Sequence, residues 1–300
     1  MNLKKQYNTN LSLLNQTGII TPLPSSGLHG VVGINSMVYP MPTIEQIQVV
    51  FDNNKDLIER KIRQGFTQLQ ITPLAMPLPC LIEQAKAIIQ AHAESGRIFR
   101  TKQSSADPDT PIKVNTKGPV WIWERIQRVL DTDWVIYFPK VYSPQGNQGM
   151  SKAEAVHNKQ VCAFPGWSVG LIEPLTILPQ PGQGRLIDDR QQLECGSSPR
   201  EYHQVLGAPA YQHESGWTLE DFLTYFITQF EVTGQVSHDR ADNNALWLLG
   251  QYLPDLEKTP NLVPVGYWSS TLGKKLYLSA HRTGNHFKMC GARTIVRLPG

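Results

Sequence analysis

The 300-residue chain has only four cysteines, lacks any long hydrophobic run, and ends in a segment without a single acidic residue. Its cysteines, Cys80, Cys162, Cys195 and Cys290, are scattered, and no two have the CxxC spacing of a zinc site. A disulfide scaffold is unusual in a chain of this length, so we expect free, mostly structural thiols. No run approaches the roughly 20 apolar residues that a membrane-spanning helix needs.

The amino-terminal stretch lacks the apolar core of a secretory signal peptide. We therefore expect a cytoplasmic protein, and display on a surface or within a particle stays open. Hydrophobic residues make up 40% of the chain and charged residues 18%, which indicates a globular rather than a disordered protein. The 23 glycines and 22 prolines favour a loop-rich α+β fold over a helical bundle.

Motifs of the common enzyme classes are missing as well. The chain has no G-x-S-x-G and no H-E-x-x-H, and the Gly-Gln-Gly at residues 182–184 is too short for a phosphate-binding fingerprint. The best candidates for metal ligands in the sequence are His203, His213, His238, Glu214 and Asp239. Single histidines in loops and turns are ordinary, so we expect no metal, no cofactor and no catalysis.

Residues 263–297 differ from the rest of the chain in charge and composition. They contain six lysines and arginines, whereas the whole chain has a net charge of +3, so the remainder sums to about −3 (3 minus 6). Aromatic side chains alternate with Ser, Thr, Asn and His, a composition typical of binding surfaces. We call residues 263–297 the tail.

Two β-rich runs are predicted in the tail. Residues 275–279 alternate, so Leu276 and Leu278 would face the core while Tyr277 and Ser279 face outward. Residues 294–298 form the second run, and the residues between, 281–290, have the composition of a loop. A rigid strand pair that carries a loop is a common way to place binding residues.

The upstream sequence predicts three regions. Residues 1–40 contain clusters of the turn-forming residues Pro, Ser and Gly and are expected to form an extended arm. Residues 41–200 combine helix and strand patterns and predict an α+β supporting region. Residues 201–300 are expected to form a ligand-binding domain, whose clearest helix begins at a capping box of Thr218 and Asp221 and ends at Gly234.

The tail carries specific motifs. It opens with Val263-Pro264, continues with Tyr-Trp-Ser-Ser-Thr at residues 267–271, and closes with the pattern Gly-x-Arg-x-x-Val-Arg. Upstream, Thr-Gln-x-Glu-x-Thr at residues 228–233 is followed by Gly-x-Tyr-x-Pro at residues 250–254. In these motifs and their order, the chain resembles the target proteins of diversity-generating retroelements. In that family a prokaryotic reverse transcriptase rewrites adenine positions in the last part of the gene.

This resemblance implies a C-type-lectin-like fold at the carboxyl terminus that displays the rewritten residues to a ligand. The implied ligand-binding residues are Tyr267, Ser269, Thr271, Leu272, Lys274, Tyr277, Ser279, His281, Asn285, His286 and Lys288. The implied fixed scaffold comprises Trp268, Gly291, Arg293 and Arg297. The two scaffold arginines are expected to pair with interior carboxylates or carbonyls. One branch of this fold generates formylglycine with paired cysteines, and no partner cysteine lies near Cys290 in the sequence.

The resemblance therefore implies a non-catalytic protein that binds a protein or another macromolecular surface. A basic segment with interleaved aromatic residues is also what a single-strand nucleic-acid binder shows. Six cations could neutralise several phosphates, and binding would then depend steeply on salt. Nucleic-acid binding stays open as the alternative function.

Overall fold

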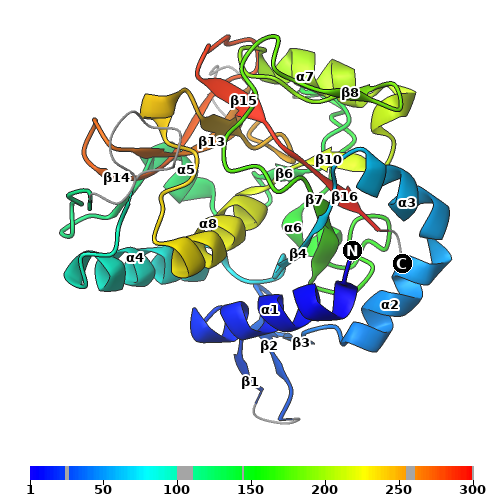
Figure 1. Cartoon of the computed structure of the whole chain (residues 1–300), viewed down its shortest axis with the longest axis horizontal. Coiled ribbons are helices and arrows are strands. Elements are labelled where there is room, and N and C mark those ends of the chain that lie inside the picture. Colours follow the sequence, from blue (N-terminus) through cyan, green and yellow to red (C-terminus); the bar gives the residue numbers. More distant parts are fainter. Residues whose placement is uncertain (24–26, 100–110, 144, 255–260, 299–300) are drawn as a thin grey trace.

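The computed structural model describes residues 1–23, 27–99, 111–143, 145–254 and 261–298. Within these residues the chain forms a mixed α+β fold with eight α-helices and five small sheets (Figure 1). The α-helices are α1 (Leu3–Gln16), α2 (Ile44–Asn53), α3 (Lys55–Arg63), α4 (Leu78–Glu94), α5 (Glu124–Val129), α6 (Lys152–Ala155), α7 (Pro199–Leu206) and α8 (Leu219–Thr233). Two short 3-10 helices are η1 (Pro209–Tyr211) and η2 (Arg240–Asp242). None of the described helices is long and apolar enough to cross a membrane.

Two sheets form the centre of the molecule. The five-stranded sheet has the order β15-β11-β13-β14-β5, with the bounds Cys290–Ala292, Ala245–Trp247, Leu262–Ser269, Lys275–Arg282 and Val120–Ile122. The four-stranded sheet has the order β10-β16-β7-β4, with the bounds Glu214–Gly216, Thr294–Arg297, Ser168–Ile172 and Gln68–Thr72. Each sheet joins strands from both sides of residue 200, so the predicted supporting region and the predicted ligand-binding domain share both sheets.

The remaining strands form small sheets at the periphery. Strands β1 (Thr21–Pro22), β2 (His29–Val32) and β3 (Val38–Pro40) form an antiparallel sheet that extends from one end of the molecule (Figure 1). Strand β6 (Ile136–Tyr137) pairs with β12 (Gln251–Tyr252), and β8 (Leu186–Ile187) pairs with β9 (Arg190–Gln191).

Helix α8 is the central helix of the fold. The predicted capping box is confirmed, because Thr218 accepts a hydrogen bond from the amide of Asp221 and Asp221 accepts one from the amide of Thr218. The helix ends at Gly234, whose φ of +63° is left-handed and whose missing side chain leaves room for the carbonyl of Arg97. Apolar residues all round the helix are buried, because it contacts α1, α4, β4 and β13 (Figure 1).

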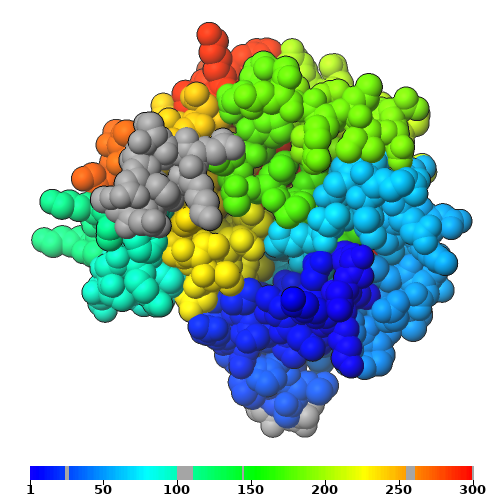
Figure 2. Space-filling view, viewed as in Figure 1, coloured from blue at the N-terminus to red at the C-terminus, as the bar shows by residue number. Residues whose placement is uncertain are grey.

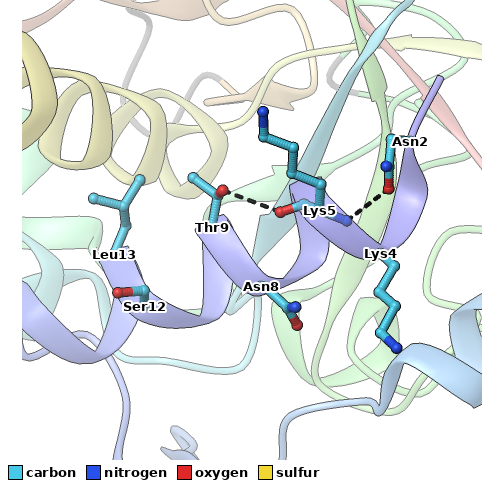
Figure 3. Close-up of a pocket in the computed structure, with 7 residues that line it drawn as sticks. All are labelled: Asn2, Lys4, Lys5, Asn8, Thr9, Ser12 and Leu13. Atoms are coloured by element: carbon cyan, nitrogen blue, oxygen red, sulfur yellow. Dashed lines mark hydrogen bonds between the residues drawn. The ribbon is translucent and has the colours of Figure 1, made fainter.

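The prediction of an extended arm for residues 1–40 is wrong. Residues 3–16 form α1, whose amino-terminal amide at Lys5 donates to the side chain of Asn2 (Figure 3). Leu3, Tyr7 and Leu14 share one face of this helix and are buried, and α1 packs on β4 and α8. The prolines and glycines that suggested an arm begin only at Pro22, after the helix has ended.

Two local features complete the helices and the larger sheet. Helices α2 and α3 are separated at Asn54, and Gly65, at a φ of +103°, follows the end of α3. Strand β11 holds Trp247 fully buried.

Candidate ligand-binding site

Strands β13 and β14 divide the tail into two faces. They pair antiparallel with Tyr267 opposite Tyr277 and Trp268 opposite Leu276. Trp268, Leu276 and Leu278 are fully buried, and the Trp268 ring stacks on Phe226 of α8 with the centroids 6.3 Å apart. Side chains alternate along a strand, so Tyr267, Tyr277 and Ser279 lie on the opposite face of the sheet. This alternation confirms which residues of β14 face the core.

The face opposite α8 contains a pocket of about 320 Å³. Five of the predicted ligand-binding residues line it, namely Tyr267, Leu272, Tyr277, Ser279 and His281. Phe287 and Met289, from the loop after β14, also line it. Trp121 of β5, Arg240 of η2 and Ala245 of β11 line it from outside the tail. The sheet thus brings distant parts of the sequence to one site, because β5 pairs with β14 and η2 contacts β13.

Several aromatic rings line the pocket. Tyr267 and Tyr277 stack with 5.2 Å between centroids, and Trp121 lies 5.3 Å from Tyr277 at a tilt of 46°. On the other side, the ring of Phe287 lies 4.9 Å from that of His281 in a T-shaped arrangement. These spacings are those of favourable aromatic pairs. The Tyr277 hydroxyl donates to the carbonyl of Leu272 at 2.7 Å, which holds the turn between the two strands over the pocket.

Among the described residues that line the pocket, one arginine supplies positive charge. The guanidinium of Arg240 lies 5.8 Å from the centroid of the Tyr267 ring, and its Nε donates to the sulfur of Met289 at 3.1 Å. Burial, reinforced by the charge of Arg240, lowers the pKa of His281 below its ordinary value of 6.5. The imidazole of His281 is therefore neutral at neutral pH.

The other predicted ligand-binding residues lie outside the pocket. Thr271, Lys274, His286 and Lys288 are exposed, and Asn285 is half-buried. The Nδ1 atom of His286 lies 3.4 Å from the carboxylate of Glu201 at the surface.

Ser269 does not fit the prediction of a displayed residue. It is fully buried, and its hydroxyl accepts a hydrogen bond from the amide of Leu272 at 2.9 Å. This bond closes the turn between β13 and β14, so the side chain of Ser269 is part of the fold. Tyr267, Tyr277 and Ser279 are also less exposed than the prediction of an outward face implied, at 8% each, because they line a pocket rather than an open surface.

The predicted scaffold residues are buried. Arg297 forms an ion pair with Asp221 of α8 and donates to Ser215 and Ser168. Arg293 donates to the carbonyl of Glu173, and its guanidinium lies 4.3 Å from the centroid of the Trp217 ring. Both arginines thus pair in the interior, as the family resemblance implied. Gly291 faces Cys195, whose sulfur would lie 2.9 Å from an added Cβ.

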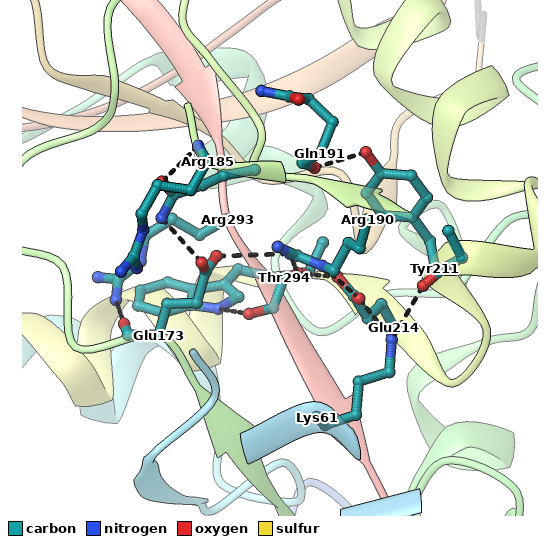
Figure 4. A network of polar contacts seen from close by, with 12 residues as sticks. Lys61, Glu173, Arg185, Arg190, Gln191, Tyr211, Glu214, Arg293 and Thr294 are labelled. Atoms are coloured by element: carbon teal, nitrogen blue, oxygen red, sulfur yellow. Dashed lines mark hydrogen bonds and ion pairs between the residues drawn. The ribbon is translucent and has the colours of Figure 1, made fainter. Parts of the chain in front are cut away.

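A buried network of ion pairs and hydrogen bonds contacts the last part of the tail (Figure 4). Glu214 accepts hydrogen bonds from Arg190, from Lys61 at 2.7 Å and from the hydroxyl of Thr294 at 2.6 Å. Burial lowers the pKa of Lys61. Glu214 is therefore an ion-pair residue, and its partners were not recognisable in sequence because they lie more than 20 residues away. Among the described residues, no group of three or more His, Cys, Asp or Glu is arranged to hold a metal ion.

The cysteines are free, and two of them are neighbours in space. The amide of Gly196 donates to the carbonyl of Cys290 at 2.9 Å, so Cys195 lies beside the Cys290–Gly291 backbone although it is distant in sequence. Burial raises the pKa of Cys195 to about 11 and that of Cys290 to about 12. Both thiols are protonated at neutral pH, which makes them poor nucleophiles.

Two further depressions bear on the choice of site. A depression of about 660 Å³ adjoins the pocket, shares Trp121, Ser279 and His281 with it, and adds Arg125 and Arg282. The depression along α1 is lined by residues from successive turns of that helix, and no tail residue lines it (Figure 3). In the space-filling view, the exposed part of the tail lies at the end of the molecule opposite the amino-terminal sheet (Figure 2).

Comparison with family models, curated proteins and solved structures found no match. Function is therefore inferred from the residues and geometry of this chain.

Proposed function

We propose that this protein is a non-catalytic ligand-binding protein and a target of a diversity-generating retroelement. Its tail would present a diversifiable binding surface on a C-type-lectin-like scaffold formed mainly by residues 201–300. The observation that carries the proposal is the division of β13 and β14. Tyr267, Tyr277 and His281 line a pocket, whereas Trp268 and Arg297 are buried among fixed contacts. Such a division lets the ligand-facing residues change while the core stays intact.

The chemistry of the pocket supports binding over catalysis. General acid–base catalysis needs a titratable group positioned beside a partner that tunes it. Among the described residues, no Asp or Glu lines this pocket. His281 is neutral and packs against aromatic rings, and the Cys290 thiol is protonated. An apolar pocket with one fixed charge suits recognition of a ligand group.

The burial of two tail arginines weakens the nucleic-acid alternative. Of the six tail cations, Arg293 and Arg297 are buried and paired, which leaves four (6 minus 2) for contacts at the surface. A single-strand binder also needs a groove that follows the backbone and a platform for successive bases. The pocket holds about 320 Å³, which suits one side chain rather than a strand.

A random peptide library, panned on the immobilised protein, tests this proposal. We expect the enriched peptides to lose binding to S279F, because Ser279 lines the pocket and a phenylalanine there would fill it. The matched control is V49F, which adds the same side chain at an exposed position of α2. Circular dichroism and thermal melts establish that both variants are folded.

The two variants separate the outcomes. Peptides that bind the parent protein and V49F but not S279F would support a binding site at this pocket. Enrichment only of peptides that bind S279F equally well, or a failure to enrich any peptide, would contradict the proposed function.

A further inference from the structure

We infer that the pocket takes the aromatic side chain of a polypeptide whose neighbouring residues are acidic; the inference rests on the proposed function and names its ligand class. Two residues outside the tail would determine this preference for an aromatic side chain with acidic neighbours. Trp121 of β5 supplies a ring, and Arg240 of η2 supplies the charge. Changes confined to residues 263–297 would leave both in place, so the preference would persist while the tail varies.

The shape of the pocket favours a flat apolar group. Tyr267 and Tyr277 form one wall, and Trp121 extends it at the edge of the sheet. Phe287 lines the opposite side, with the adaptable thioether of Met289 beside it. A ring inserted between these walls can make offset or edge-to-face contacts, and its area is what makes an aromatic side chain an effective anchor.

The charges around the pocket favour acidic neighbours for that ring. Arg240 belongs to the pocket lining, and the adjoining depression contributes Arg282. Among the described residues, neither depression is lined by an Asp or Glu. A site with cations and no acidic lining produces a positive potential that attracts acidic partners and disfavours basic ones.

The arrangement of these features favours a polypeptide over a nucleic acid. The ring site and Arg282 of the adjoining depression meet at Trp121, Ser279 and His281, which line both depressions. A peptide that inserts one ring can therefore place the residues next to it over the adjoining depression. A nucleic-acid strand would instead stack successive bases, and the pocket walls leave space for one ring.

Three short blocked peptides test the inference by ligand-observed NMR titration at low salt. The probe is GDFDG, and its controls are GKFKG, which keeps the ring and reverses the charge, and GDADG, which keeps the charge and removes the ring. We expect GDFDG to bind at least about ten-fold more tightly than GKFKG, a difference of about 1.4 kcal/mol. GDADG should not bind measurably, and S279F should abolish the binding of GDFDG.

The variant R240Q tests the source of the charge preference. Arg240 is exposed, so we expect R240Q to fold normally and to reduce the ratio between GDFDG and GKFKG several-fold. Equal binding of the two peptides, or an unchanged ratio in R240Q, would overturn the inference. Binding of oligothymidylate that displaces GDFDG and tolerates S279F would also overturn it, in favour of a nucleic-acid surface.

The inference and the proposed function fail differently. If panned peptides depend on the pocket but carry basic or uncharged residues beside the ring, the inference alone is wrong. If no ligand is sensitive to S279F, the proposed function itself is wrong.

Discussion

The ring of Tyr267 lies nearly parallel to that of Tyr277, with an angle of 5° between the planes and 5.2 Å between the centroids. The two residues are paired across β13 and β14, on the face opposite α8. Neighbouring side chains of this kind are energetically coupled. We therefore expect the contributions of Tyr267 and Tyr277 to binding to be non-additive.

Two substitutions of Tyr277 separate its hydroxyl from its ring. Y277F removes the hydrogen bond to the Leu272 carbonyl and should cost about 0.5–1.5 kcal/mol of unfolding free energy while ligand binding is retained. Y277A also removes the ring, and it should cost more stability and abolish binding. Urea unfolding and peptide titration measure both effects. Retention of full binding in Y277A would remove Tyr277 from the site.

The two faces of the tail should respond differently to truncation. W268A removes a fully buried ring that stacks on Phe226, and we expect a loss of about 3–5 kcal/mol. L272A truncates a side chain that is 56% exposed, and we expect a change within about 0.5 kcal/mol together with weaker binding. Denaturant unfolding of the two variants checks this ranking. The reverse order would refute the division of the tail into ligand-facing residues and core residues.

The ion pair between Arg297 and Asp221 should be essential to the fold. R297M leaves the buried carboxylate of Asp221 without its partner, and we expect a loss of about 3–5 kcal/mol. As the control, K55M breaks the exposed pair of Lys55 with Glu59 and should change stability by less than about 1 kcal/mol. Equal effects of the two substitutions would show that Arg297 is not a structural anchor.

His238 should make the fold sensitive to acid. It is fully buried among Trp217, Phe222 and Tyr225, and its Nδ1 has no hydrogen-bond partner in the described part of the chain. Burial together with Arg293 lowers its pKa well below 6.5. As the pH falls below about 6.5, His238 becomes protonated in the unfolded chain before it does in the folded protein. The free energy of unfolding therefore decreases by up to about 1.4 kcal/mol per pH unit. Above that pH the contribution of His238 is constant.

The variant H238F tests the origin of this pH dependence. Urea unfolding between pH 7.5 and 5 should show a shallower loss of stability in H238F than in the parent protein. Parallel curves for the two proteins would mean that His238 does not titrate differently in the folded and unfolded states.

Local patterns predicted part of this structure well. The capping box at Thr218, the left-handed Gly234 and the alternation along β14 are set by neighbouring residues, and each is present in the structure. The failed prediction of an extended arm has a local cause as well. The turn residues after Thr21 outweighed the helical spacing of Leu3, Tyr7 and Leu14 before them.

The composition of the pocket was only partly predictable. Tyr267, Leu272, Tyr277, Ser279 and His281 came from the tail pattern, whereas Trp121 and Arg240 reach the site through strand pairing and packing. Such long-range contacts leave no local signal in a single sequence. The burial of Ser269 was missed for a similar reason, because its role in the turn depends on the conformation of residues 269–272.

The central claim is tested most directly by sequencing the DNA that flanks the gene. We predict a near-copy of the segment encoding residues 263–297, beside a reverse-transcriptase gene, with differences confined mainly to adenines of the copy. Those differences should fall in the codons of pocket residues such as Tyr267, Tyr277 and His281, and the codons of Trp268 and Arg297 should match. A complete flanking sequence without such a copy, or differences concentrated in the codons of buried residues, would contradict a diversifiable binding surface.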